Sequence, residues 1–226
     1  MRPTIVFDLD GTLVDTAPDL LRALDFTLEH EGLNPPEDHE ARNFIGSGAR
    51  AMIERALAYS QVQFGKEKID GMFRQFLVYY EEHIADHSRP FPGVEQALVR
   101  LKGEGALLAV CTNKHAKYAE KLLRALNLAD HFTFIAGGDT FAFKKPDPRH
   151  LTGAIEGAGG ALERAVLIGD SETDVITAKA AEIPVVAVSF GYTDIPPAAL
   201  GADRLVHKFE EVPAAAMDLI AARRLA

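Results

Sequence analysis

The stretch that decides the fold is Thr4-Ile-Val-Phe-Asp8-Leu-Asp10-Gly-Thr12, in which an apolar run leads directly into two acids and a glycine. The run Thr4–Phe7 predicts a buried β-strand, because it is short, apolar and rich in β-branched residues. Asp8 and Asp10 are two residues apart, so both side chains can leave the strand end on one side. Gly11 permits a sharp turn after them. This pattern predicts paired carboxylates at one edge of a sheet.

Further apolar runs follow along the chain and alternate with amphipathic segments. Such alternation is typical of a parallel sheet that is buried on both faces. The predicted strands are Thr4–Phe7, Leu107–Cys111, Phe132–Ala136, Ala165–Ile168, Pro184–Ser189 and Arg204–Val206. The predicted helices are Val94–Lys102, Lys117–Leu126, Arg149–Ala158, Asp174–Ala181 and Ala214–Arg223. We therefore expect an α/β fold with a Rossmann-like parallel sheet core flanked by helices.

The alternation is interrupted after the first strand by a long segment without a convincing strand, which a simple βαβ crossover does not require. Asp19–His30, Ala41–Tyr59 and Lys66–His87 instead have the apolar spacing of amphipathic helices. The sequence thus predicts an inserted α-helical bundle, or cap, at 17–85. The core domain is expected to be discontinuous, with 1–16 and 86–226 on either side.

Composition limits the classes of protein to which the chain can belong. With 226 residues, 47% of them hydrophobic, the chain can bury a core without disulfide bridges, and Cys111 has no second cysteine to pair with. A net charge of −9 argues against a nucleic-acid binder. We see no targeting leader and no apolar run long enough for a bilayer, so a cytoplasmic protein, monomer or homodimer, is expected.

Polar residues follow several of the predicted strands, at the edge where open α/β sheets bind ligands. They are Asp8 and Asp10, Thr112-Asn113, Lys145-Pro146, and the segment Gly169-Asp170-Ser-Glu-Thr-Asp174. Asp8, Asp10 and Asp170 would repel one another unless a cation lay between them, and Mg²⁺ accepts a few carboxylates together with phosphate oxygens. A calcium loop does not fit, because Gly11 is the fourth residue from Asp8 rather than the sixth. A plain turn remains the alternative.

These four segments, in this order, resemble the motifs of the haloacid dehalogenase superfamily, and the helical insert resembles the cap of its subfamily I. The further segments Phe44-Ile-Gly-Ser-Gly48, Thr112-Asn-Lys114, Gly137-Gly-Asp139, Lys144-Lys-Pro-Asp-Pro148 and Phe190-Gly-Tyr192 resemble the phosphoglycolate phosphatases within it. The resemblance implies an Mg²⁺-dependent phosphoric monoester hydrolase that acts on a small phosphorylated metabolite through an aspartyl-phosphate.

The resemblance also implies a role for each residue that matches a motif. Asp8 would be the nucleophile and Asp10 the general acid and base. Thr112, Asn113, Lys145 and the turn at Gly11 would bind the phosphoryl group, with Thr112 offering its hydroxyl and its backbone N–H. Lys144 competes with Lys145, and Thr112 also fits as a hydroxyl that only closes a strand end.

Metal binding is expected from Asp8, Asp10, Asp170 and Asp174. Asp174 also fits as a carboxylate in the first turn of a helix.

Substrate choice would come from the cap, which covers the reacting group in such enzymes. We expect 2-phosphoglycolate, whose carboxylate would be received by Arg50 or by the backbone of the turn Gly46-Ser-Gly48. A sugar phosphate, pyrophosphate or a nucleotide monophosphate is the alternative substrate. From another class, a phosphometabolite-binding regulator without turnover would keep the same fold.

Overall fold

The protein is divided into two compact units. The computed structural model describes residues 2–37, 41–45 and 48–223 of the chain. One unit consists of Met1–Asp15 and Pro90–Ala226, and the other of Thr16–Arg89. We call them the sheet unit and the helical unit. Across the described residues, none of the helices has the length and apolar character that crossing a membrane requires.

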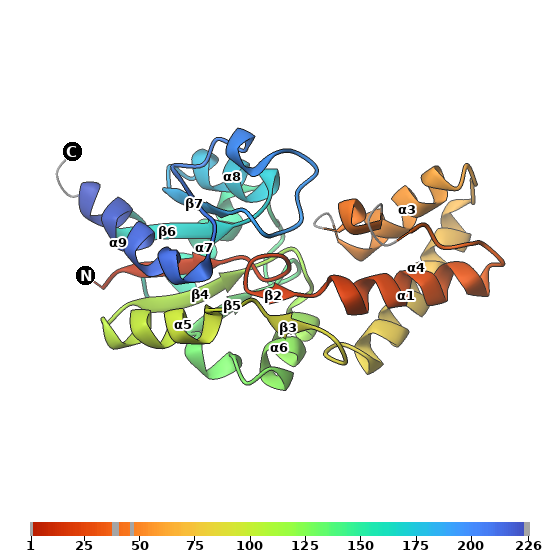
Figure 1. Ribbon diagram of the computed structural model, residues 1–226, viewed down its shortest axis with the longest axis horizontal. Helices are drawn as coiled ribbons and strands as arrows, with labels where there is room; N and C mark the ends of the chain where they lie inside the picture. Colours follow the sequence, from red (N-terminus) through yellow and green to blue (C-terminus); the bar gives the residue numbers. More distant parts are fainter. Residues whose placement is uncertain (1, 38–40, 46–47, 224–226) are drawn as a thin grey trace. The chain divides into compact units, whose positions relative to one another are not determined.

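The sheet unit is built on a parallel sheet of six strands in the order β5-β4-β1-β6-β7-β8 (Figure 1). Its strands are β1 (Thr4–Phe7), β4 (Leu107–Cys111), β5 (Phe134–Ala136), β6 (Ala165–Gly169), β7 (Val185–Val188) and β8 (Arg204–Val206). Phe7 at the end of β1 is in register with Val110 of β4 and with Ile168 of β6. The residues that follow β1, β4 and β6 therefore emerge together at the carboxyl edge of the sheet.

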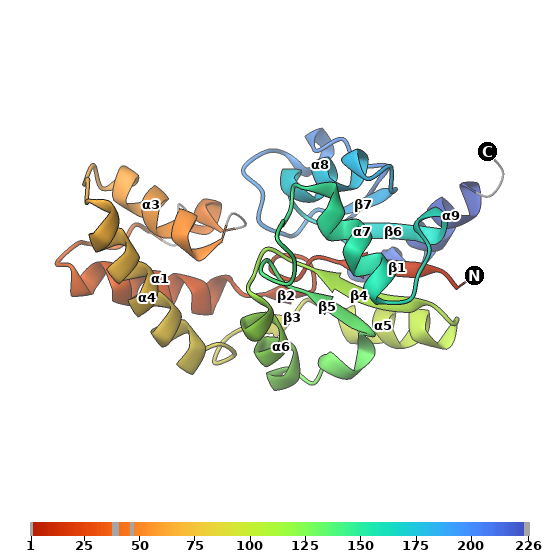
Figure 2. The same cartoon turned by 180° about the vertical axis from the view of Figure 1, so that it is seen from behind.

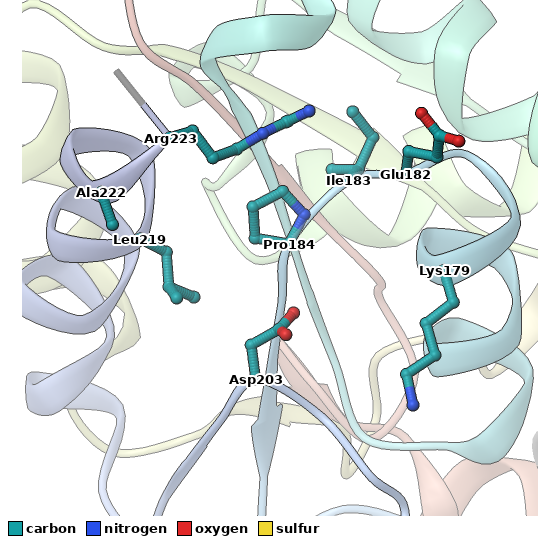
Figure 3. A pocket seen from close by; sticks show the side chains of 8 residues that line it. All are labelled: Lys179, Glu182, Ile183, Pro184, Asp203, Leu219, Ala222 and Arg223. Atoms are coloured by element: carbon teal, nitrogen blue, oxygen red, sulfur yellow. The ribbon is translucent and has the colours of Figure 1, made fainter. Parts of the chain in front are cut away.

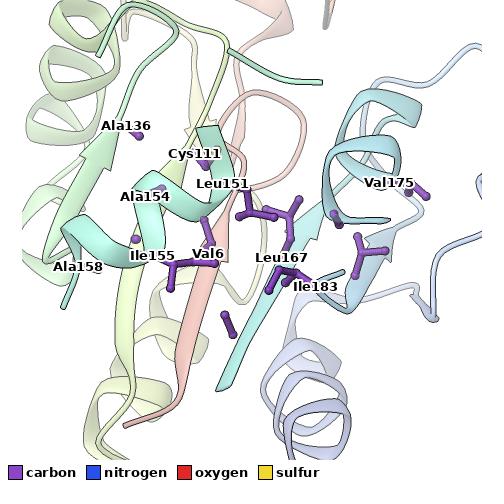
Figure 4. Close-up of a cluster of buried hydrophobic side chains, with 14 of the residues drawn as sticks. Val6, Cys111, Ala136, Leu151, Ala154, Ile155, Ala158, Leu167, Val175 and Ile183 are labelled. Atoms are coloured by element: carbon purple, nitrogen blue, oxygen red, sulfur yellow. The ribbon is translucent and has the colours of Figure 1, made fainter. Parts of the chain in front are cut away.

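Helices cover both faces of this sheet (Figures 1 and 2). They are α5 (Val94–Gly103), α6 (Ala116–Ala125), α7 (Pro148–Gly157), α8 (Glu172–Ala180) and α9 (Val212–Ala222). The helices α7 and α8 pack together against the central strands, and α5 and α9 pack together as a second pair. Figure 4 shows Leu151 and Ile155 of α7 beside Val6 of β1 and Leu167 of β6, all fully buried. This apolar packing holds the central strands and hence the sheet edge that they share.

The helical unit contains α1 (Ala17–His30), α3 (Ala49–Tyr59) and α4 (Lys66–Glu82), and α4 packs against both of the others. Its interior is apolar, with Leu24, Ile53 and Phe76 fully buried. The single helix predicted over Ala41–Tyr59 is wrong: α3 begins only at Ala49, because Gly48 has a φ of +94° that a right-handed helix does not accept. The turn residues Gly46 and Ser47 lie outside the described residues.

Two short strands, β2 (Val14–Asp15) and β3 (Arg89–Pro90), form a separate two-stranded sheet that the sequence did not predict. Two residues carry too little periodicity to be recognised. The helix predicted to end at His87 ends at Glu82, and the carboxylate of Asp19 instead accepts the backbone N–H groups of His87 and Ser88. The predicted fold class, a Rossmann-like α/β core with an inserted helical bundle, is confirmed.

Candidate active site

Asp8 and Lys145 form a buried ion pair at the carboxyl edge of the sheet. Asp8 follows β1 and its backbone N–H donates to the carbonyl of Ile168 at 2.9 Å, which continues the strand pairing by one residue. Lys145 comes from the loop before α7, and its Nζ lies 2.9 Å from Asp8 Oδ1. The Lys145 side chain is only 2% exposed, whereas the neighbouring Lys144 is exposed. Of the two lysines that the sequence left open, Lys145 is therefore the one beside Asp8.

Asp174 holds the other side of this lysine. Its Oδ1 accepts from Lys145 Nζ at 2.6 Å, while its Oδ2 accepts from the hydroxyl of Ser171 at 2.6 Å. Ser171 is the N-cap of α8 and receives the N–H of Asp174 in return, which makes a capping box. The capping box agrees with the first-turn role expected for Asp174, and the same carboxylate also orients Lys145. Metal binding by Asp174 stays a prediction.

Asp170 lies beside them at the end of β6. Its Oδ1 accepts from the hydroxyl of Thr12 at 2.7 Å, and its Oδ2 accepts from the backbone N–H of Tyr192 at 2.6 Å. Two glycines leave room for it: a Cβ at Gly11 would lie 2.4 Å from Asp170 Oδ2, and a Cβ at Gly191 would lie 2.2 Å from its Cβ. Any larger residue at either position would displace this carboxylate.

Asp8, Asp170 and Asp174 together form what we call the acid cluster. One carboxylate oxygen of each lies within 4.8 Å of the others, and all three residues are buried. Three carboxylates with one lysine leave an excess of negative charge in a place that water barely reaches. Oxygen ligands at this spacing fit a hard divalent cation such as Mg²⁺.

The pKa values of Asp8, Asp170 and Lys145 are shifted by burial and by the charges of their neighbours. Burial raises the pKa of Asp8 to about 6, against the opposing effect of Lys145. Burial, followed by the charges of Asp174 and Asp8, raises the pKa of Asp170 well above its usual value. Burial alone would lower the pKa of Lys145, but the two carboxylates outweigh it and raise that pKa. The lysine therefore stays charged, while Asp8 and Asp170 are destabilised as anions until a further cation joins them.

Asp10 stands apart from the acid cluster and pairs with a second lysine. Lys114 Nζ lies 2.9 Å from Asp10 Oδ1 and 3.0 Å from its Oδ2. The two side chains are 7% and 16% exposed, respectively. The sequence did not assign Lys114 a role, although it lies in the quoted segment Thr112-Asn-Lys114. The signal was its position two residues after Thr112, in the loop that follows β4, the strand next to β1.

Thr112 and Asn113 follow β4 and lie at the same edge. Thr112 is 2% exposed, and its N–H donates to the carbonyl of Ala136 at 2.9 Å, so this donor is already used within the sheet. Its hydroxyl oxygen accepts the N–H of Lys114 at 3.2 Å. Asn113 donates from Nδ2 to the carbonyl of Lys145 at 3.1 Å and thereby connects the two loops. The N–H of Gly11 likewise donates to Val14.

Two residues that position this edge were not found from the sequence. Tyr192 holds Asp170 through its N–H and places its hydroxyl 2.5 Å from Asp15 Oδ1. His150, fully buried in α7, accepts the N–H of Lys145 at Nδ1 over 3.2 Å, and its Nε2 lies 3.1 Å from the carbonyl of Gly137. The quoted segment Phe190-Gly-Tyr192 was a signal for the first, whereas nothing near His150 distinguished it from a core residue.

Arg50 lies in the helical unit, where acids already match its charge. It contacts Asp70 Oδ1 at 2.7 Å and Glu54 Oε1 at 3.1 Å, with its side chain 38% exposed. Cys111 is fully buried, and burial raises the pKa of its thiol to about 12, which does not suit a nucleophile. Cys111 therefore adds no reactive thiolate to the sheet edge, and the role expected for Arg50 stays a prediction.

A separate hollow of about 500 Å³ lies in the sheet unit, at the amino ends of β7 and β8 (Figure 3). Pro184 and Asp203, which precede these strands, line it together with Leu219 and Arg223 of the α9 region. Asp203 Oδ2 accepts the N–H of Val185, and Arg223 donates to the carbonyl of Leu162. These charged side chains hold the local structure, and the hollow contains none of the groups gathered at the carboxyl edge.

A family model described as haloacid dehalogenase-like hydrolase matches residues 5–188, a range that includes Asp8, Asp10, Thr112, Lys145, Asp170 and Asp174. The chain belongs to this hydrolase family. Among curated relatives, a phosphoglycolate phosphatase of Mesorhizobium japonicum is 53% identical over 193 residues, which are 85% of each chain. A phosphoglycolate phosphatase of Caulobacter vibrioides is 45% identical over 217 residues, 96% of this chain and 92% of the relative. These relatives confirm the prediction of an enzyme of the phosphoric monoester hydrolase class.

Solved structures agree with the family. A predicted phosphoglycolate phosphatase from Haemophilus somnus superposes with a TM-score of 0.88 at 29% identity, over 95% of this chain and 97% of that one. CbbY from Rhodobacter sphaeroides, solved in complex with phosphate, superposes with a TM-score of 0.81 at 28% identity, over 96% and 100% of the two chains. A mutant of CbbY was also solved with xylulose-(1,5)bisphosphate.

Proposed function

We propose that this hydrolase converts 2-phosphoglycolate to glycolate and phosphate through an aspartyl-phosphate on Asp8. The observation that carries the mechanism is the position of Asp8: a buried carboxylate at a strand end, 2.9 Å from the Nζ of Lys145 and within the acid cluster. Support for the substrate comes from relatives named phosphoglycolate phosphatase at up to 53% identity.

Two displacements make up the reaction. A carboxylate oxygen of Asp8 forms a bond to phosphorus, and the bond from phosphorus to the ester oxygen breaks. Asp10 gives a proton to the departing alkoxide, so glycolate leaves as the alcohol. Asp10 then takes a proton from a water molecule as that water attacks phosphorus, which releases phosphate and restores the Asp8 carboxylate.

Positive groups and hydrogen-bond donors would hold the transferring phosphoryl group. Lys145 supplies the fixed charge, and Thr112 and Asn113 supply polar side chains from the neighbouring strand end. Because the N–H groups of Thr112 and Gly11 already have acceptors, the Thr112 hydroxyl rather than its backbone is the donor we assign. Gly11 then contributes mainly by leaving space beside Asp170.

Asp8 and Asp170 would hold the magnesium ion. When bound, Mg²⁺ would offset negative charge on the phosphoryl oxygens. Asp174, the third member of the acid cluster, would also orient Lys145, from whose Nζ its Oδ1 accepts at 2.6 Å. Asp10, two residues after Asp8, is also expected to help hold the magnesium ion. Its carboxylate is the group that transfers the proton to the leaving alkoxide. The helical unit would act as a cap that covers the substrate, with Arg50 among its charged residues.

The alternative is the same chemistry on another phosphomonoester. One solved relative of the same fold binds a sugar bisphosphate, which favours a sugar phosphate as the second candidate. A regulator that binds a phosphometabolite without turnover is the rival from another class. All three candidates would use the same groups at the sheet edge. Measuring which esters are hydrolysed, if any, therefore distinguishes them.

Phosphate release from a panel of phosphomonoesters tests the proposal. We expect release with Mg²⁺, highest for 2-phosphoglycolate, and a loss of at least about 1000-fold on chelation or in Asp8→Asn. Asp130→Asn, an exposed acid of the same unit, is the matched control and should keep full activity. Release that persists in Asp8→Asn would refute the covalent mechanism, and no release from any ester would favour the regulator.

A further inference from the structure

The pair of Lys114 and Asp10 is a second lysine-carboxylate contact at the sheet edge, separate from that of Lys145. Both Asp10 oxygens lie within 3.0 Å of Lys114 Nζ. With its side chain 7% exposed, Lys114 has lost most of its hydration, which an ammonium group gives up only at a large cost. The two residues meet because they follow β1 and β4, whose ends are paired at Phe7 and Val110.

The two lysines divide the site into a phosphoryl side and a leaving-group side. Lys145 contacts Asp8 and Asp174, so its charge serves the group that receives phosphorus. Lys114 contacts Asp10, which in the proposed reaction must come within hydrogen-bond distance of the ester oxygen. An ammonium that touches both oxygens of this acid therefore lies close to the carbon atoms attached to that ester oxygen.

We propose that Lys114 determines substrate specificity by receiving the carboxylate of the leaving group. This inference rests on the proposed function and names the class of substrate: phosphomonoesters whose ester carbon carries a carboxylate. In 2-phosphoglycolate the carboxylate is one carbon from the ester oxygen, so it would lie near the lysine that contacts the acid serving that oxygen. A lysine is a compact charge with rotatable donors, so it can contact a second carboxylate beside the first.

Lys114 is better placed for this role than Arg50, the residue expected from the sequence. Arg50 is paired with Asp70 and Glu54 in the helical unit, so a substrate carboxylate would have to compete with two acids. Lys114 contacts Asp10, the acid proposed to serve the leaving group, and it belongs to the same unit as the reacting groups. Specificity for the charged leaving group would then be built into the sheet unit.

The test compares two esters, 2-phosphoglycolate and 2-hydroxyethyl phosphate, in which the ester carbon carries a charged carboxylate or a neutral hydroxymethyl group, respectively. In the full chain with Mg²⁺ we expect a preference for 2-phosphoglycolate that falls about 10- to 100-fold in Lys114→Met, mainly through KM. Lys114→Arg should recover part of that preference, because it keeps the charge. Lys144→Met, which removes an exposed lysine outside the site, should leave the preference unchanged.

Several results would overturn the inference. An equal loss of kcat/KM for both esters in Lys114→Met would mean that Lys114 only positions Asp10. A wild-type enzyme that hydrolyses both esters equally well would refute the specificity while leaving the phosphatase function in place. If neither ester were hydrolysed, the proposed function would fail and this inference with it.

Inhibition of the unsubstituted chain tests the inference even if Lys114→Met does not fold. Glycolate should compete with 2-phosphoglycolate at concentrations at least about tenfold below those of ethane-1,2-diol, because only glycolate carries the charge that Lys114 would bind. Equal inhibition by the two alcohols would overturn the inference.

Discussion

His150 should make the folded protein lose stability on mild acidification. It is fully buried, with Nδ1 accepting the N–H of Lys145 and Nε2 facing the carbonyl of Gly137. Burial, and then the charge of Lys145, lowers the pKa of His150 to about 4 from 6.5. Between these two values the unfolded chain binds a proton at this histidine and the folded chain does not. Stability from His150 is therefore present above about pH 6.5 and falls as the pH drops toward 4.

The size of the effect follows from the two pKa values. A histidine with a pKa of 6.5 when unfolded and about 4 when folded lowers the free energy of unfolding by about 2 kcal/mol between about pH 7.5 and about pH 5. Asp8 contributes with the opposite sign, because its raised pKa of about 6 makes the folded chain bind protons more readily. The contribution of Asp8 cancels when the wild type is compared with His150→Gln, because both proteins retain Asp8.

The assay is urea unfolding followed by far-UV circular dichroism at both pH values, for the wild type and for His150→Gln. The amide keeps a donor and an acceptor but does not titrate, so the variant should lose about 2 kcal/mol less than the wild type on acidification. His207→Gln, an exposed histidine of the sheet unit, should behave like the wild type. Equal losses in the wild type and His150→Gln would refute the reasoning, since His150 would then not be held neutral.

Two further substitutions test the packing. Gly11→Ala should raise the Mg²⁺ concentration for half-maximal phosphate release at least about tenfold, because its Cβ would lie 2.4 Å from Asp170 Oδ2. Gly32→Ala has a similarly positive φ but no atom within 4 Å, so a rise in both variants would contradict this explanation. Asp19→Ala should destabilise the protein by about 3 kcal/mol in urea unfolding, because it leaves the buried N–H and hydroxyl of Ser88 without their acceptor. A loss below about 1 kcal/mol would show that water replaces it.

Most of the fold could be predicted because its signals are local. Short β-branched runs separated by amphipathic segments define a parallel α/β sheet wherever they occur, and the limits of β1 and β4 agreed with the predicted residues. The break in the helix before Ala49 was harder to predict, because the φ angle of Gly48 is not fixed by its residue type. The two-residue strands β2 and β3 were beyond prediction for a similar reason, since their pairing joins segments far apart in the chain.

The sequence alone also determined which strand ends carry acids, since that depends only on residue order and on the rule that parallel strands share a carboxyl edge. The tertiary structure decided which atoms meet there. It brought Lys145 rather than Lys144 to Asp8, joined Asp10 to Lys114, and used the Thr112 N–H within the sheet. Those contacts depend on how loops from separate strands pack and on which buried charges are paired. Burial and distances between residues far apart in the chain cannot be inferred from the order of neighbouring residues.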